Sequence, residues 1–80
     1  MYCVYLIKSL RENWVYVGST GNLDKRVTQH NKGKVTSTKF RTPYKLIYFE
    51  EYPTAKEARE REKELKLSRS KKEDILKKLV

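Results

Sequence analysis

Cysteine, long apolar runs and a leader-like N-terminus are scarce or missing in this sequence of 80 residues. The single cysteine, Cys3, excludes an internal disulfide framework and any zinc site built from several cysteines. No apolar run approaches the roughly 20 residues that a membrane-spanning helix needs. The first residues show no positive start followed by a long apolar stretch, so we expect no secretory signal. These absences favour a reducing, cytoplasmic setting and no membrane partner.

Acidic residues are also absent from one long stretch. Between Lys25 and Phe49 there are seven basic residues and no Asp or Glu, in a chain of net charge +9. The 27 residues from Thr54 onward instead mix ten basic with six acidic side chains, which is typical of a solvated helix face. Like charges repel unless a partner neutralises them, so the basic stretch indicates a polyanionic binding partner. Nucleic acid is the commonest such partner. A patch that only aids solubility is the alternative.

The length and the hydrophobic pattern predict one small α+β domain over residues 1–80, with helices covering a sheet. A chain this short buries roughly 60% of its unfolded surface, so it can build one small core. Aromatic and β-branched runs predict the strands, and the short polar gap between the first two suits an antiparallel hairpin. The expected elements are strands at 2–8, 14–19 and 44–52, and helices at 23–31, 54–67 and from residue 70.

Local signals mark the helix ends. Asn22 is a good N-cap for the first helix, and Gly33 is a plausible stop after it. Thr54-Ala-Lys-Glu57 and Ser70-Lys-Lys-Glu73 have the form of capping boxes, in which a hydroxyl and a carboxylate satisfy the first free N–H groups. The two boxes predict where the second and third helices begin.

Glu62 does not fit a purely apolar packing face. At about 100° per residue it lies in the same stripe of the second predicted helix as Ala58 and Leu65. A carboxylate there is costly unless a cation or hydrogen bonds compensate it. Arg61 or Lys66 can pair with it, and a divalent metal is the other candidate. The residues alone leave both open.

Arg26 and His30 are four residues apart, so they lie on one side of the first predicted helix, which Leu23 shares. Histidine can move a proton near neutral pH or hydrogen-bond a phosphate. Arginine stays charged and can hold a phosphate with two parallel bonds. An ordinary polar pair at a helix edge is the alternative interpretation.

Tyr5 and Tyr16 belong to neighbouring strands and can share a face near the start of the first helix. Aromatic residues in such positions normally serve cross-strand packing. A phenol becomes a useful base only when a cation or metal lowers its pKa from about 10, and Arg26 and Lys25 are candidate sources of that field. We expect Cys3 to be a buried strand residue without a nucleophilic role.

The ordered set of these segments resembles the GIY-YIG nuclease domain, and within it the small standalone GIY-YIG proteins of bacteria. The matching segments are Tyr-Cys-Val-Tyr at 2–5, Tyr-Val-Gly-Ser-Thr at 16–20, Leu-Asp-Lys-Arg-Val-Thr-Gln-His-Asn at 23–31, and the segments at 41–50 and 57–66. Cys3 and Val4 stand where the family has glycine and isoleucine, and Ser19 stands where some members have lysine. The resemblance implies a three-stranded antiparallel sheet flanked by helices, in the order β-β-α-β-α-α.

The resemblance also implies an activity, the hydrolysis of DNA phosphodiester bonds with one Mg²⁺ or Mn²⁺ ion held by Glu62. The substrate form is left open, whether nicked, branched or single-stranded, and RNA is not excluded. The tyrosine that acts as general base, alone or through the histidine, is also left open. Two alternatives are a nucleic-acid-binding module that keeps the fold without catalysis, and a structural or protein-interaction domain.

The candidate site residues fall into three sets. The catalytic candidates are Tyr5, Tyr16, Arg26, His30 and Glu62. The substrate-positioning candidates are Gly18, Ser19, Lys25 and Asn31. Gly18 belongs there because a missing side chain lets a substrate backbone come close. The basic residues expected to follow the nucleic-acid backbone are Lys32, Lys34, Lys39, Arg41 and Lys45.

Overall fold

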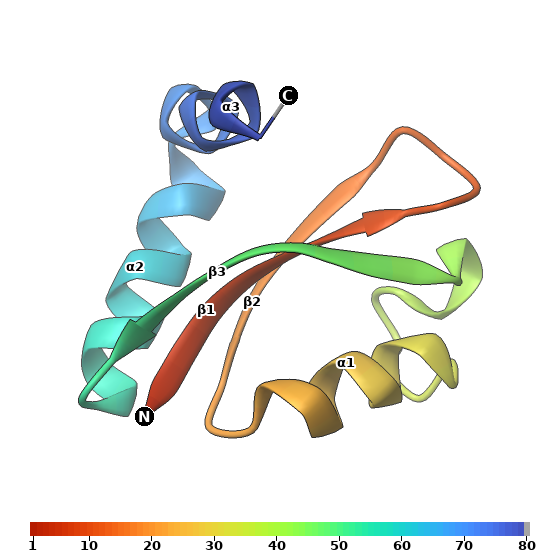
Figure 1. The fold of residues 1–80 in the computed structure, drawn as a ribbon, viewed down its shortest axis with the longest axis horizontal. Helices are drawn as coiled ribbons and strands as arrows, with labels where there is room; N and C mark the ends of the chain where they lie inside the picture. Colours follow the sequence, from red (N-terminus) through yellow and green to blue (C-terminus); the bar gives the residue numbers. More distant parts are fainter. Residues whose placement is uncertain (80) are drawn as a thin grey trace.

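A three-stranded antiparallel sheet in the order β2-β1-β3 forms the centre of the fold (Figure 1). A computed structural model describes residues 1–79 of the chain. The strands are β1 (Tyr2–Ser9), β2 (Val15–Thr20) and β3 (Tyr44–Tyr52), each within one residue of its predicted bounds. β1 lies in the middle and pairs antiparallel with both neighbours. The central strand therefore places its side chains under the helices on both faces.

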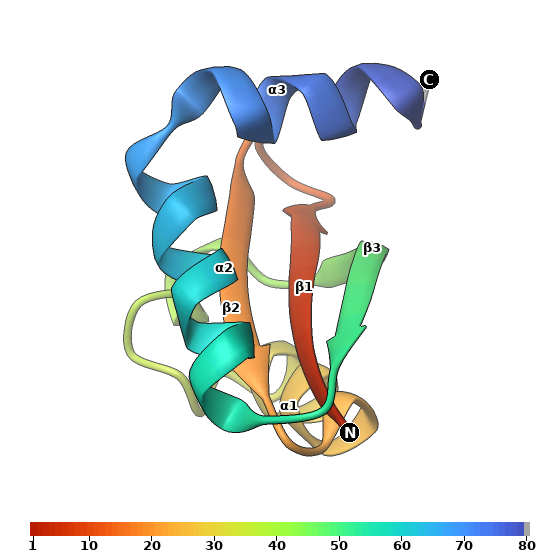
Figure 2. The same cartoon turned by 90° about the vertical axis from the view of Figure 1, so that its left-hand side faces the viewer.

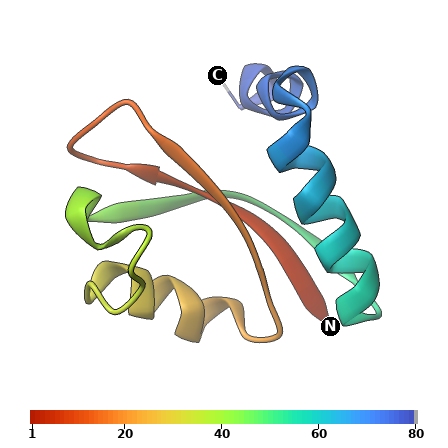
Figure 3. The same ribbon diagram turned by 180° about the vertical axis from the view of Figure 1, so that it is seen from behind.

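The helices cover the two faces of the sheet unequally. α1 (Leu23–Asn31) lies against one face, and α2 (Ala55–Leu67) and α3 (Arg69–Lys78) lie on the other (Figures 1 and 3). Figure 2 shows α3 running across one end of the sheet. A short 3₁₀ turn, η1 (Lys39–Arg41), interrupts the loop between α1 and β3. The predicted order β-β-α-β-α-α is confirmed, and no helix within residues 1–79 has the length and apolar character needed to cross a membrane.

The predicted starts of α1 and α2 are confirmed by their caps. Asn22 Oδ1 accepts the N–H of Lys25 at 3.1 Å, and the Thr54 hydroxyl accepts the N–H of Glu57 at 3.2 Å. α1 ends where Gly33 adopts φ = +74°, a backbone region that favours glycine. These local signals hold because each cap satisfies an N–H or C=O group that the helix leaves free.

The predicted N-cap of α3, Ser70, is wrong by two residues. The helix begins at Arg69, and its N-cap is Ser68, whose hydroxyl accepts the N–H of Lys71 at 3.4 Å. Ser68 is also the C-cap of α2, so one residue in extended conformation separates the two helices. The box at Ser70–Glu73 lies inside the first turns of α3 because Ser68 already provides the break.

Two hydrophobic clusters lie on opposite faces of the sheet. Side chains alternate along a strand, so Tyr5 and Ile7 face α1 while Val4 and Leu6 face α2. The cluster under α1 has the buried members Tyr5, Ile7 and Tyr44. The cluster under α2 and α3 has the buried members Val4, Leu6, Val17, Ala58, Leu65 and Ile75. The first cluster has two buried phenols, those of Tyr5 and Tyr44.

A β-bulge in β3 changes which side chains meet α2. Leu6 pairs with Tyr48 and Ile7 pairs with Leu46, so Ile47 has no partner in the ladder. The extra residue leaves Leu46 in the cluster under α1 and moves Tyr48 to the cluster under α2. Every second residue after the bulge then also faces α2, which places Glu50 against that helix.

Candidate active site

Tyr5 and Tyr16 lie on the sheet face that α1 covers. The register pairs Tyr5 with Gly18 and Ile7 with Tyr16, so the two phenol rings are diagonal neighbours with centroids 6.5 Å apart. A Cβ atom on Gly18 would lie 2.4 Å from the Tyr5 hydroxyl and 3.0 Å from the Tyr16 ring. The space over Gly18 is therefore filled by Tyr5. This corrects the expectation that the glycine admits a substrate backbone.

His30 is completely buried between Tyr5 and the loop that follows α1. Its Nε2 lies 2.7 Å from the Tyr5 hydroxyl, and its Nδ1 lies 2.7 Å from the hydroxyl of Thr38. The Thr38 hydroxyl donates to the carbonyl of Val35 at 3.4 Å, so it accepts from Nδ1–H, and Nε2 accepts from Tyr5. Thr38 lies in a loop without hydrophobic periodicity, so no sequence signal indicated that its hydroxyl would bond His30.

Burial decides how Tyr5 and His30 titrate. Burial, with a smaller contribution from the nearby charge of Arg26, lowers the pKa of His30 to about 4. Burial also raises the pKa of Tyr5 to about 12, although the Arg26 guanidinium opposes the rise. Both side chains are therefore neutral at pH 7. Since both ring nitrogens of His30 are engaged, the histidine orients the Tyr5 hydroxyl, and its Nε2 is connected to the site only through that hydroxyl.

Tyr16 is the more accessible of the two phenols because it lies on the edge strand β2. It is half-buried, and its ring packs 6.0 Å from Trp14 and 5.2 Å from His30 between centroids. The ammonium of Lys66 lies 5.3 Å from the centroid of the same ring. This cation comes from α2, on the opposite face of the sheet, so the side chains of both layers meet at the edge of β2.

Glu62 reaches this edge from α2. Its side chain is 20% exposed, one carboxylate oxygen accepts the hydroxyl of Ser19 at 2.5 Å, and the other pairs with Lys66 at 2.6 Å. Lys66 thus contacts Glu62 and the Tyr16 ring at once. The charge of Glu62 also contributes to raising the pKa of Tyr5. Lys66 therefore connects Glu62 to the Tyr16 ring at the edge of β2.

Arg26 approaches from α1. Its side chain is half-buried, and one guanidinium nitrogen donates to Gln29 at 3.3 Å. Its charge contributes to the lowered pKa of His30 and opposes the rise that burial causes in the pKa of Tyr5. The neighbouring Lys25 is exposed on the same helix. Cations thus enter the site from α1 and from α2, which suits an anionic group at the edge of β2.

The donors around Glu62 fit a hard divalent cation. A carboxylate oxygen and the Ser19 hydroxyl are the ligand types that Mg²⁺ and Mn²⁺ prefer, and magnesium keeps several waters. The Lys66 side chain is half-exposed, so it can leave the carboxylate when a cation competes for it. Within residues 1–79, no three His, Cys, Asp or Glu side chains gather as a metal-binding group. A metal bound at Glu62 would have one protein carboxylate.

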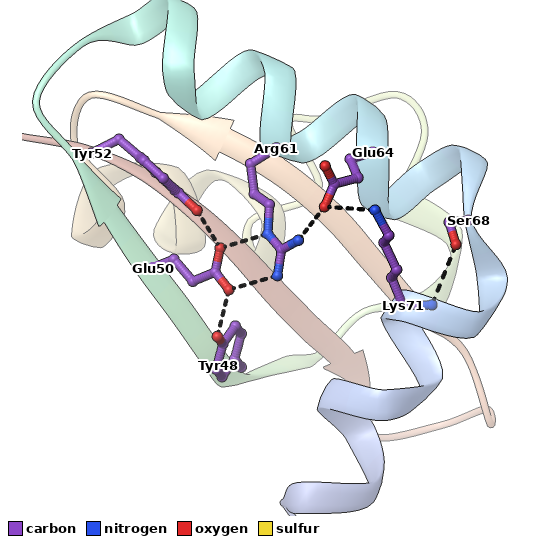
Figure 4. Close-up of polar contacts among 7 residues, drawn as sticks. All are labelled: Tyr48, Glu50, Tyr52, Arg61, Glu64, Ser68 and Lys71. Carbon is purple, nitrogen blue, oxygen red and sulfur yellow. Dashed lines mark hydrogen bonds and ion pairs between the residues drawn. The ribbon is translucent and has the colours of Figure 1, made fainter.

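A hydrogen-bonded network fixes α2 against β3 (Figure 4). Arg61 donates to Glu50 through Nε at 2.9 Å and through Nη2 at 3.1 Å. The hydroxyls of Tyr48 and Tyr52 donate to the same carboxylate at 2.5 and 2.7 Å. Burial alone would raise the pKa of Glu50, but these hydrogen bonds overcome it and lower the pKa to about 2.

The network corrects one expected pairing. Arg61 was a candidate partner of Glu62, but its guanidinium binds Glu50 and also pairs with Glu64. Lys71 of α3 pairs with Glu64 at 3.3 Å, so α3 joins the same network. Because Arg61 precedes Glu62 in the helix, the turn of α2 that holds Arg61 on β3 also directs Glu62 to the edge of β2.

Three other expected site residues have different surroundings. Both amide atoms of Asn31 bond the main chain of Tyr44, at 2.6 and 3.2 Å, which fixes the end of α1 to β3. Arg41 pairs with Glu12 at 2.7 Å. Lys45 lies across the sheet from α1, in a hollow beside Leu76. The exposed basic residues that remain together on the loop after α1 are Lys32, Lys34 and Lys39.

Comparison with protein families identifies the domain. The model described as the GIY-YIG catalytic domain matches residues 1–74. The chain belongs to the GIY-YIG family. Membership supports nuclease-type activity and a nucleic-acid substrate in general terms, and GIY-YIG nucleases generally depend on a divalent metal.

Individual relatives are small GIY-YIG proteins. A UPF0213 protein of Clostridium perfringens is 40% identical over 78 residues, which cover 95% of this chain and 83% of the relative. The UPF0213 protein YazA of Bacillus subtilis is 44% identical over 71 residues, covering 86% of this chain and 71% of YazA. The solution NMR structure of a UPF0213 protein from Bacillus halodurans has a TM-score of 0.60 and 32% identity, covering 96% of this chain and 84% of that one. This likeness agrees with the GIY-YIG fold described above.

Proposed function

We propose that this protein is a metal-dependent endonuclease that hydrolyses phosphodiester bonds of DNA. The observation that carries the proposal is the position of Lys66, which contacts both Glu62 and Tyr16 and so joins α2 to the tyrosine face. Arg26 faces the same tyrosines from α1. A phosphate at this edge would meet a base, a guanidinium and a carboxylate from three different elements.

Each side chain takes a role that its surroundings support. Tyr16 serves as the general base toward the attacking water, because it is the more accessible of the two phenols. Tyr5 stays protonated at pH 7, since its pKa is raised to about 12, and its hydroxyl bonds His30. Tyr5 and His30 therefore form the buried base of the site. Arg26 neutralises charge that develops on the phosphoryl oxygens.

Glu62, oriented by Ser19, is the residue that would hold one Mg²⁺ or Mn²⁺ ion. When bound, such an ion stabilises the charge on the phosphate and on the leaving oxygen. Lys66 compensates Glu62, and it would have to leave the carboxylate for an ion to bind there. Lys25 and the loop residues Lys32, Lys34 and Lys39 supply positive charge to the substrate backbone.

The test is a cleavage assay on supercoiled plasmid and branched DNA with Mg²⁺ or Mn²⁺. Glu62→Ala and Arg26→Ala should each lower the rate by about 10²-fold or more, with the fold and most of the DNA affinity retained. Glu60→Ala is the matched control, because Glu60 is an exposed carboxylate on the same helix. If the wild-type protein leaves every substrate intact with either metal, the nuclease proposal is rejected.

One observation favours a second candidate function. Lys66 already compensates Glu62 without a metal, which suits a nucleic-acid-binding module that keeps the fold but not the chemistry. Such a module would bind DNA in a salt-dependent manner and would bind equally well as Glu62→Ala. Binding without cleavage in the same assay selects this alternative.

A further inference from the structure

Phe40 is displayed to water on a structured turn. Its side chain is 77% exposed, the largest exposed fraction among the big hydrophobic side chains of residues 1–79. An aromatic ring in that position contributes little to the stability of the fold, because little of its surface is removed from water. A single exposed hydrophobic residue needs no explanation by itself. The way the turn is built supplies further observations.

The η1 turn that carries Phe40 is anchored on both sides. Before it, the buried Thr38 bonds His30 through its side chain, and its carbonyl accepts the Tyr44 hydroxyl at 2.9 Å. At its last residue, the carbonyl of Arg41 accepts the hydroxyl of Ser9 at 2.7 Å. With both flanks held, the backbone at Phe40 is fixed, and the ring stays at the surface. An aromatic group that is held in place loses little entropy when a ligand stacks on it.

The chemical surroundings of Phe40 are cationic. Lys39 and Arg41 flank it in sequence, and the Lys39 ammonium lies 4.9 Å from the centroid of its ring. The turn also lies within the stretch of residues 25–49 that has no acidic side chain. An apolar protein partner has no need of such charge, whereas a nucleic acid offers phosphates to the cations and flat bases to the ring.

The turn adjoins the candidate active site through aromatic contacts. The Arg41 guanidinium lies 4.5 Å from the centroid of the Trp14 ring, and Trp14 packs 6.0 Å from Tyr16 between centroids. The bond from Thr38 to His30 is a second connection. A strand whose phosphate lies at Tyr16 therefore has a neighbouring segment close to η1.

We propose that Phe40 is a stacking platform for an unpaired nucleobase, and that the protein prefers nucleic acid with a single-stranded segment. A base in an intact duplex is stacked on its neighbours, so its faces are not free to meet a side chain, whereas an unpaired base exposes them. Lys39 binds the phosphate on one side of that base. Arg41, which pairs with Glu12 at 2.7 Å, exchanges that carboxylate for the phosphate on the other side. The inference rests on the nucleic-acid substrate of the proposed function and is independent of cleavage.

The experiment compares two labelled single-stranded DNA oligonucleotides of about 12 nucleotides, one with all its bases and one with abasic sites in place of most of them. Both carry the same phosphate charge, so a difference in affinity reports base contacts. Fluorescence anisotropy is measured in EDTA to prevent cleavage. The wild-type protein should bind the base-containing strand about tenfold more tightly than the abasic strand, and more tightly than the matching duplex.

The variants separate stacking from packing. Phe40→Leu keeps an apolar side chain without a π face, so it should lose the tenfold preference and leave abasic binding unchanged. Phe40→Tyr should keep the preference. Phe49→Leu is the matched control, because Phe49 is 48% exposed but is followed by Glu50 and Glu51. It should behave as the wild type.

Trp14 provides a second readout within the same titration. It is the only tryptophan of the chain, and Arg41 lies over its ring, so phosphate binding at Arg41 should change its fluorescence.

Equal affinity of the wild type for both strands overturns the proposal, even if cleavage is found. An equal loss on both strands in Phe40→Leu also overturns it. A base preference in a protein that cuts nothing leaves it standing and rejects only the nuclease. An RNA strand of the same sequence shows whether either sugar is accepted.

Discussion

At the scale of single residues, Gly18 is the point on which the tyrosine pair depends. Its missing side chain accommodates the Tyr5 hydroxyl, and Tyr5 cannot retreat because it is buried and bonded to His30. The sequence pattern identified the glycine and assigned it a different purpose. The side chain that contacts a glycine is set by the tertiary structure, because the residues next to the glycine in sequence do not determine which ring packs over it.

We predict that Gly18→Ala lowers the free energy of unfolding by about 1–3 kcal/mol, since the new methyl group overpacks the contact with Tyr5. Gly21→Ala is the control, because its Cβ would meet the exposed Tyr2 ring at 3.1 Å, which can move away. Urea unfolding gives both values. In a Tyr5→Leu background the cost of Gly18→Ala should shrink, and strict additivity of the two changes would show that Tyr5 is not the obstacle.

His30 makes stability depend on pH in a defined window. Its pKa is about 4 in the folded state and about 6.5 in the unfolded chain, so the unfolded state takes up the proton first as the pH falls. Stability is complete above pH 6.5 and is lost on the way down to pH 4. Between pH 7 and pH 5 we predict a loss of about 2 kcal/mol from this residue.

The measurement is the urea midpoint at the two pH values for the wild type and for His30→Gln. The variant should be less stable at pH 7 but should lack most of the change with pH, because His30 is the only histidine of the chain. Parallel pH profiles for the two proteins would contradict the burial of a neutral histidine.

At the scale of elements, local sequence signals predicted the strands and most helix ends. They did not predict how residues distant in the sequence pair in the sheet. The bulge at Ile47 is an example. Without it, the alternation that places Tyr44 and Leu46 under α1 would continue to Tyr48 and Glu50. The shift of one residue follows from pairing with β1, which the sequence of β3 alone does not encode. For this reason the sequence pointed to Glu62 but missed the carboxylate that actually binds Arg61.

The anchoring of α2 leads to a prediction about stability. Arg61→Met leaves Glu50 without its guanidinium partner, with 18% of that side chain exposed, and should cost about 2 kcal/mol at pH 7. Arg69→Met removes a pair in which the arginine is 91% exposed and should cost less than about 0.5 kcal/mol. Thermal and urea unfolding of the two variants test the difference.

The pH dependence of the anchoring adds a check. The pKa of Glu50 is about 2 when folded and about 4.5 when unfolded, so its contribution is complete above pH 4.5 and is lost as the pH falls toward 2. In Arg61→Met this acid-induced loss should be smaller, because the main cause of the low pKa is gone. Equal costs for Arg61→Met and Arg69→Met would mean that the network does not stabilise α2.

At the scale of the whole molecule, charge is distributed by face and not by sequence. The exposed lysines of the loop after α1 lie on the side of the candidate site, while Lys45 belongs to the same basic stretch but lies under α3. The sequence predicted a continuous basic path along residues 32–45. The strand register divides that path, because consecutive residues of β3 face opposite sides of the sheet.

This division predicts how salt affects nucleic-acid binding. Each phosphate contact contributes roughly 0.7–0.9 to the slope of log affinity against log salt concentration. The double change Lys32→Ala, Lys34→Ala should therefore reduce the slope by roughly 1.5. Lys77→Ala, Lys78→Ala on α3 makes the same change in net charge across the sheet and should leave the slope unaltered. Lys45→Ala should behave like the α3 pair, although its place in the sequence groups it with the loop. Equal reductions for both double variants would mean that binding responds to net charge alone, and the face-specific path from the loop to Tyr16 would then have to be abandoned.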